Sequence, residues 1–192
     1  GGTPLPAPPD RPKSDISVCA RLRPGPRHEM CIFAETPNCV HFRRRDAAQK
    51  QDEPYWCDHA FGPEATQEQV FETAVAPTCS AVLEGYNGAV IAYGQTGSGK
   101  THTIIGDAQH RGVIPRALSR IFASLQMRKH WSVEVSVLEI YNERTRDLLA
   151  PGQFATQVDI HEVPGKTSAE GVPCFECPEA TRKEVRSPEE AL

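Results

Sequence analysis

The feature that most constrains the fold is an eight-residue segment, residues 94–101, with the sequence G-Q-T-G-S-G-K-T. It matches the pattern G-x-x-x-x-G-K-[ST], which is typical of a phosphate-binding loop. The apolar residues 89–93 directly before it predict a strand, and a helix is expected to begin at about Gly99. A strand, a glycine-rich loop and a helix in this order predict an α/β P-loop NTPase, with a mixed, mostly parallel central sheet flanked by helices.

The residue types in this loop are those that a bound triphosphate requires. Glycines leave the backbone bare and free to reach positive φ, so several N–H groups can converge on phosphate oxygens. The N-terminus of the following helix points its positive end at the same anion. Lys100, the predicted catalytic residue, should reach the β- and γ-phosphates, and the Thr101 hydroxyl should coordinate Mg²⁺. The predicted nucleotide-binding residues of the loop are Gly94, Gln95, Thr96, Gly97, Ser98, Gly99, Lys100 and Thr101.

Segments on both sides of the loop resemble the kinesin motor domain. The matching segments are R-L-R-P at 21–24, G-Y-N at 85–87, A-Y before the loop at 92–93, R-G-V-I-P-R at 111–116, L-E-I-Y-N-E at 138–143 and R-D-L-L at 146–149. They occur in the family's order and at similar spacing. The resemblance covers residues 15–192, and it implies a partial kinesin motor core that uses ATP or ADP with Mg²⁺.

The resemblance also implies an adenine site next to the loop. The residues that it assigns to this nucleotide-binding region are Arg21, Arg23, Pro24, Tyr86 and His102. The Arg21 guanidinium can lie over a purine face, and Pro24 can pack against the ring edge. Without the resemblance, Arg21 would be interpreted as a solvated strand end, Tyr86 as a packed aromatic residue and His102 as a surface histidine.

The function that the resemblance implies is an ATP-driven motor that binds microtubules, and hence tubulin. It would be located on the cytoskeleton in the cytoplasm and would oligomerise through a stalk that is not present in this chain. The family's switch-loop motifs, N-x-x-S-S-R-S-H and D-L-A-G-S-E, do not occur in these 192 residues. We therefore expect residues 15–192 to be the N-terminal part of a motor domain, truncated before its switch regions. One alternative is a nucleotide-binding module without hydrolysis or motility, and another is a small-molecule kinase with the same loop.

Composition argues against several other classes of protein. The net charge of −4 gives no global basic field, so nucleic acid is not an expected partner. No apolar run approaches the length of a membrane span. Seven scattered cysteines predict reduced thiols, and the C-x-x-C at 174–177 lacks the second pair that zinc would need. A microtubule contact would have to use local cations, of which the C-terminal part offers Lys166, Arg182, Lys183 and Arg186.

Local patterns predict the remaining elements. The proline-rich residues 1–14 are expected to be a disordered lead-in. Strands are expected at 16–22 and 55–61, with a small hairpin at 31–45 around Pro37 and Asn38. A capping box formed by Thr66 and Gln69 predicts a helix that is kinked at Pro77 and ends at Gly85, with Phe71, Val75, Cys79 and Val82 on one face.

In the second half of the sequence, Pro115 predicts the start of a helix with an apolar face that includes Phe122. Alternating valines predict a strand at 131–140, and a short helix is expected at 142–149. The last expected elements are a strand at 158–163, a turn at Pro164-Gly165 and a helix start at Ser187-Pro188-Glu189-Glu190.

Overall fold

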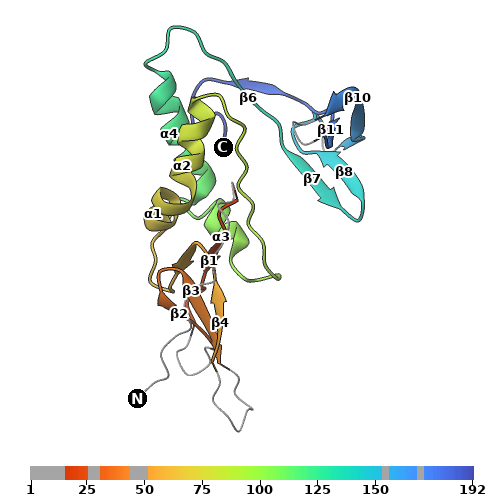
Figure 1. Cartoon of the computed structure of the whole chain (residues 1–192). Helices are drawn as coiled ribbons and strands as arrows, with labels where there is room; N and C mark the ends of the chain where they lie inside the picture. The colour runs from red at the N-terminus through yellow and green to blue at the C-terminus, as the bar shows by residue number, and fades with distance from the viewer. Residues whose placement is uncertain (1–15, 26–30, 44–51, 153–155, 168–170) are drawn as a thin grey trace. The chain divides into compact units, whose positions relative to one another are not determined.

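The computed structural model describes residues 16–25, 31–43, 52–152, 156–167 and 171–192 (Figure 1). The predicted lead-in at 1–14 lies outside the described residues. The chain divides into two compact units, Gly1–Ser124 and Leu125–Leu192, which we call the N-terminal and the C-terminal unit.

The N-terminal unit contains two small sheets. β1 (Cys19–Arg21) pairs in parallel with β5 (His59–Phe61). β2 (Ile32–Thr36), β3 (Cys39–Arg43) and β4 (Asp52–Trp56) form an antiparallel sheet in that order. The predicted hairpin is therefore confirmed, because β2 and β3 pair directly across Pro37 and Asn38.

The single strand predicted at 55–61 is wrong, because the chain forms β4 and β5 in two different sheets. Two backbone hydrogen bonds turn the chain between them. The Cys57 N–H donates to the Asn38 carbonyl at 3.0 Å, and the Asp58 N–H donates to the Val18 carbonyl at 2.8 Å. Residues 55–61 contain no glycine or proline, so the sequence pattern did not reveal this corner.

A continuous helical segment follows, made of α1 (Gln67–Val70), the π-helical turn η1 (Phe71–Val75) and α2 (Ala76–Leu83). The predicted capping box is confirmed: the Thr66 hydroxyl accepts the Gln69 N–H at 3.1 Å, and the Gln69 side chain accepts the Thr66 N–H at 2.9 Å. The irregularity expected at Pro77 takes the form of η1, since proline has no N–H for the helical ladder. The segment ends before Gly85, which has φ 104°.

Two further helices complete this unit: α3 (Lys100–Ile104), which follows the loop, and α4 (Val113–Leu125). α4 begins two residues before the predicted Pro115, which lies in its first turn. The buried core joins the helical segment to the start of α4 and consists of Phe71, Val75, Ala76, Cys79 and Val113, with Ala74, Ile104 and Ala117 packed against it. Val82, which was predicted to share this face, is 38% exposed.

The strand predicted at residues 89–93 is not formed. Ile91 is 86% exposed and Tyr93 is 98% exposed, and no described strand pairs with this segment. A strand needs neighbours that use its N–H and C=O groups, and an apolar sequence does not supply them. Its apolar side chains therefore remain at the surface.

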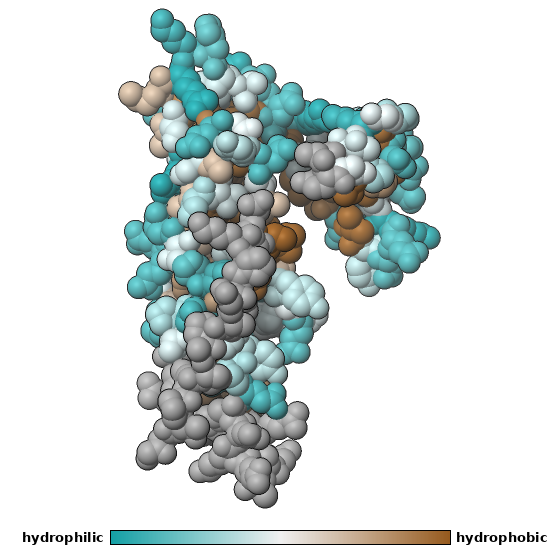
Figure 2. All heavy atoms as spheres, in the orientation of Figure 1, coloured by the Kyte–Doolittle hydropathy of each residue, from teal (hydrophilic) through white to brown (hydrophobic). Residues whose placement is uncertain are grey.

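The C-terminal unit is built from short antiparallel strands. β7 (Leu138–Tyr141), β8 (Arg144–Asp147) and β9 (Thr156–Val158) form one sheet. β10 (His161–Thr167) pairs with β11 (Pro173–Glu176), and β6 (Val133–Val135) pairs with β12 (Lys183–Val185). Figure 2 shows hydrophobic residues at the surface of this unit, where Ile140 and Phe175 are exposed.

The helix predicted at 142–149 is wrong, because these residues form a hairpin turn and the strand β8. Asn142 has φ 49° and Glu143 has φ 60°, and a two-residue type I′ turn requires positive φ at both of these positions. The turn reverses β7 into β8. The single strand predicted at 131–140 is likewise two strands, β6 and β7, in different sheets.

The last predicted elements also differ from the structure. The strand expected at 158–163 is divided between β9 and β10, and Pro164-Gly165 lies within β10 where its pairing with β11 is irregular. The helix expected after Ser187 is a turn. Its cap is nevertheless present, since the Glu190 N–H donates to the Ser187 hydroxyl at 3.2 Å. A cap organises the first helical turn and does not by itself extend it.

Candidate nucleotide-binding site

Three glycines shape the loop that precedes α3. Gly97 has φ 78° and Gly99, the N-cap of α3, has φ 104°, so both lie in the left-handed region that favours glycine. At Gly94 a Cβ atom would lie 2.6 Å from the Ser98 hydroxyl oxygen, so a side chain would displace Ser98. These positions need glycine for the reason that the motif implies: the backbone must turn sharply and stay uncovered.

Lys100 is held inside the loop by the loop's own backbone. Its Nζ donates to the carbonyl oxygen of Gly94 at 2.7 Å and to that of Gln95 at 2.9 Å. The Ser98 N–H donates to the Gln95 carbonyl at 3.2 Å and closes the turn. An ammonium group carries three N–H donors, so one remains to reach an anion that lies in the loop.

Thr101 lies beside Lys100 in the first turn of α3 and is exposed. The described residues contain no cluster of three His, Cys, Asp or Glu side chains that could hold a metal ion. A single hydroxyl fits Mg²⁺ only as one ligand among several, which is how this ion binds with phosphate oxygens and water. The residues present therefore fit a magnesium ion that arrives with a nucleotide.

The predicted adenine residues lie next to the loop, with one exception. Arg21, Arg23, Pro24 and His102 line one pocket together with Leu22, Pro63, Ala65, Ser98, Gly99 and Thr103. Arg23 joins this pocket to the loop by donating a hydrogen bond to the Gly97 carbonyl. Tyr86 is 68% exposed beyond α2 and does not line this pocket.

Hydrogen bonds to neighbouring residues hold the Arg21 side chain in place at the pocket. Its Nη1 donates to the Gln67 Oε1 atom at 2.7 Å and to the Thr103 hydroxyl at 2.9 Å, and its Nη2 lies 3.5 Å from the Ala65 carbonyl oxygen. Burial lowers the pKa of this guanidinium. These contacts use three of the five in-plane N–H donors of the guanidinium, and a purine ring would stack on its face.

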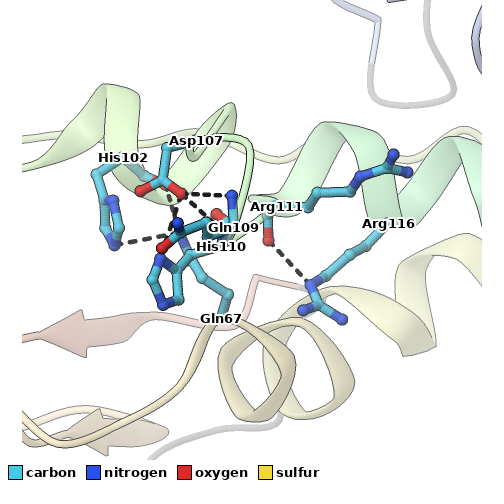
Figure 3. A network of polar contacts seen from close by, with 7 residues as sticks. All are labelled: Gln67, His102, Asp107, Gln109, His110, Arg111 and Arg116. Carbon is cyan, nitrogen blue, oxygen red and sulfur yellow. Dashed lines mark hydrogen bonds and ion pairs between the residues drawn. The ribbon is translucent and has the colours of Figure 1, made fainter.

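Gln67 is a residue of this site that the sequence did not reveal. It is only 6% exposed, and its amide accepts a hydrogen bond from Arg21. The same amide bonds to His102 and to the loop after α3 (Figure 3). Sequence position does not distinguish it from Glu68, because both follow the N-cap Thr66. Its role depends on contacts with segments 35 to 46 residues away.

A second cavity lies beneath the loop and is more apolar. It is lined by Cys19, Arg21, Phe61, Val70, Ala74, Val75, Val90, Ile91, Ala92, Tyr93, Ser98, Gly99, Lys100, Thr103, Ile104 and Val113. Burial is the main cause that raises the pKa of the Cys19 thiol, which therefore stays protonated at neutral pH.

The glycine-rich turn, the inward lysine and the pocket beside them define a P-loop nucleotide-binding protein of the α/β class. Residues 21–190 match the family model described as the kinesin motor domain. The chain belongs to the kinesin motor-domain family.

Individual relatives agree with this assignment. The chain is 38% identical to Kinesin-like protein Klp61F of Drosophila melanogaster over 167 residues, which are 78% of this chain and 16% of that protein. It is 43% identical to Chromosome-associated kinesin KIF4A of Homo sapiens over 122 residues, which are 59% of this chain and 10% of that protein. The solved structure of a fast kinesin is similar with a TM-score of 0.75 at 32% identity, over 91% of this chain and 49% of that chain. The chain therefore spans a small part of the curated relatives and about half of the solved chain.

The comparisons and the structure confirm the predicted α/β P-loop NTPase class. Within the described residues, β1 and β5 form the only parallel pair, and the other strands pair antiparallel. None of the helices in the described part of the chain has the length and apolar character that crossing a bilayer requires.

Proposed function

We propose that this chain forms the nucleotide-binding part of a kinesin motor, which hydrolyses ATP and moves along microtubules. The observation that carries the proposal is the arrangement of the loop, with Lys100 held inside it and a pocket beside it that Arg21, Pro24 and His102 line. The loop backbone from Gly94 to Gly99 would cradle the phosphates. Lys100 would neutralise the charge that builds on the γ-phosphoryl oxygens, and Thr101 would hold Mg²⁺.

The proposed adenine contacts are the residues that line the pocket: Arg21, Pro24 and His102. Arg23 would act on the loop rather than on the base, because its guanidinium donates to the Gly97 carbonyl. Among the described residues, no contact supports Tyr86 as a further partner of adenine, so its role rests on the resemblance alone.

The proposed partner is the microtubule, because the relatives are kinesins. In the C-terminal unit, the four predicted cations are exposed and available to an acidic surface: Lys166, Arg182, Lys183 and Arg186. Arg186 lies 3.6 Å from Glu184, a surface ion pair that an acidic partner can replace at small cost. Location on cytoplasmic microtubules and oligomerisation through a stalk outside this chain belong to the same proposal.

Substitution of Lys100 tests the nucleotide site. Lys100→Ala should weaken binding of Mg·ATP about 100-fold, because the phosphates lose their nearest fixed cation. Thr101→Ala should reduce the dependence of binding on Mg²⁺, whereas Thr101→Ser keeps the hydroxyl and should bind like the parent chain. Binding is measured by titration calorimetry with and without Mg²⁺. An affinity of Lys100→Ala within a few-fold of the parent contradicts the assignment.

Phosphate release across a microtubule titration separates a motor from a nucleotide-binding module. A saturable rise in phosphate release shows hydrolysis coupled to microtubules. A flat response in a chain that still binds Mg·ATP supports the module without hydrolysis. The second result is the one expected if the groups that sense the γ-phosphate lie outside these residues.

A further inference from the structure

The Gln67 side chain connects three segments of the N-terminal unit. Its Oε1 accepts a hydrogen bond from Arg21 at the end of β1 at 2.7 Å. Its Nε2 donates to the His102 carbonyl in α3 at 2.7 Å and lies 3.3 Å from the His110 carbonyl. It also lies 3.2 Å from the His102 Nε2 atom, which accepts only in the tautomer that carries the ring proton on Nδ1. The two amide hydrogens thus have two carbonyl acceptors within reach.

The partners fix the orientation of this amide. Arg21 offers only donors, and backbone carbonyls offer only acceptors. The amide oxygen must therefore face Arg21, and the amide nitrogen must face His102 and His110. A flipped amide would oppose donor to donor on one side and acceptor to acceptor on the other.

The loop that carries His110 is closed on itself. The Asp107 carboxylate accepts the Gln109 N–H at 2.9 Å and the His110 N–H at 2.7 Å (Figure 3). Gly106 also forms a β-bridge with Arg111. These bonds lower the pKa of Asp107, with the His110 N–H as the largest cause. The His110 carbonyl is therefore held in place independently of Gln67 and gives the amide a fixed anchor.

We propose that Gln67 is a positioning residue for the adenine side of the nucleotide site. It holds Arg21 and His102, which both line the pocket, at a fixed separation. Its own side chain is buried and does not line the pocket. The inference rests on the proposed nucleotide-binding function. It predicts that the donor half of the Gln67 amide affects binding of the base more than binding of the phosphates, which contact the loop backbone.

Gln67→Glu tests the donor half of the amide by removing it alone. The new carboxylate keeps an oxygen toward Arg21 and replaces the donor with an oxygen that faces the carbonyls of His102 and His110. Gln69→Glu is the matched control, because it makes the same change two residues away on the exposed side of α1, where glutamate also completes a capping box. Gln67→Asn is a second variant, which keeps the amide and shortens its reach by one methylene.

The experiment measures dissociation constants of the full chain for Mg·ADP and for Mg·pyrophosphate by titration calorimetry. Gln67→Glu should raise the dissociation constant for Mg·ADP about tenfold, the effect of one lost hydrogen bond, and should change that for Mg·pyrophosphate by about twofold or less. Gln67→Asn should show the same split, and Gln69→Glu should match the parent for both ligands.

Equal weakening of both ligands in the Gln67 variants would make the residue a general support of the fold and would overturn the proposal. Unchanged binding of both ligands would also overturn it. Failure of the proposed function gives a different result, in which the parent chain binds neither ligand or Lys100→Ala binds both as well as the parent does.

Discussion

The two units of the chain are stabilised by different interactions. The N-terminal unit has a cluster of buried apolar side chains centred on the helices, in which Phe71 is 3% exposed and Val75 is 4% exposed. In the C-terminal unit, the buried apolar side chains among the described residues are Leu125, Val158 and Val185. Burial of apolar area is thus the main stabilising term of the first unit, and it contributes less to the second.

The C-terminal unit instead contains a buried carboxylate that joins its strands. Asp147, at the end of β8, is 1% exposed. Its Oδ2 accepts the Thr181 N–H at 2.8 Å, and its Oδ1 accepts the Leu149 N–H at 2.9 Å. The Thr181 hydroxyl is the largest cause that lowers the pKa of Asp147, followed by the Thr181 N–H. The hydrogen bond between Thr181 and Asp147 joins residues that are 34 positions apart in the sequence, and it holds the segment before β12 against β8.

This difference predicts how each unit responds to its surroundings. Apolar burial does not depend on the protonation of any group, so the N-terminal core should be insensitive to mild acid. A charged carboxylate that accepts several N–H bonds is stabilised by them, and protonation weakens these bonds. Each unit contains one tryptophan, Trp56 in the first and Trp131 in the second, so their unfolding can be followed separately.

The largest expected effect is that of Phe71→Ala. Removing this buried ring should lower the free energy of unfolding of the N-terminal unit by about 3–5 kcal/mol, since the apolar contacts are lost and a cavity remains. The measurement is urea unfolding followed by Trp56 fluorescence in a Trp131→Phe background. Phe71→Leu is the control and should cost less. A larger change in unfolding at Trp131, followed in a Trp56→Phe background, than at Trp56 would contradict the contrast between the units.

Asp147→Asn should act on the C-terminal unit. The substitution removes the charge that the N–H donors of Thr181 and Leu149 stabilise, and it places an amide NH₂ against one of them. Trp131 fluorescence, followed in a Trp56→Phe background, should report unfolding at lower urea than in the parent. Glu139→Gln is the control, because Glu139 lies in the paired strand β7 but is half-exposed in a surface ion pair with Arg146.

Lowering the pH should also destabilise the C-terminal unit more than the N-terminal unit, without a mutation. The pKa of Asp147 is lower in the folded chain than its ordinary value of 3.8, so the unfolded chain binds this proton more readily. The stability that Asp147 contributes is fully present above pH 3.8, and it is lost as the pH falls through the pKa of the folded chain. The pH dependence at Trp131 should therefore weaken in Asp147→Asn. An unchanged acid response in this variant would show that other carboxylates cause it.

Local signals in the sequence predicted a large part of the fold and of the site. The glycines of the loop, the capping box at Thr66 and the hairpin around Pro37 were identified because each is determined by residues a few positions apart. Residues 142–149 were predicted wrongly because Asn142 and Glu143 adopt positive φ without a glycine to indicate a turn. Gln67 and the exposed segment 89–93 could not be predicted, since their states depend on partners far away in the chain or on neighbouring strands.

The smallest expected effect concerns the start of the helical segment. In Thr66→Ala the Gln69 N–H loses its acceptor, the Thr66 hydroxyl, while the reciprocal bond from the Thr66 N–H to the Gln69 side chain can remain. Because Thr66 is exposed, water replaces part of the lost bond, and the cost should be about 1 kcal/mol in the N-terminal unit.

Thr66→Ser keeps the hydroxyl and should unfold like the parent at Trp56, and neither variant should change unfolding at Trp131. The same variants sharpen the inference about Gln67, which is the residue that follows Thr66. If the capping box only stabilises α1, Thr66→Ala should lower stability without changing the ratio of the dissociation constants for Mg·ADP and Mg·pyrophosphate. A change in that ratio would show that the start of α1 must be held in place for Gln67 to position Arg21 and His102.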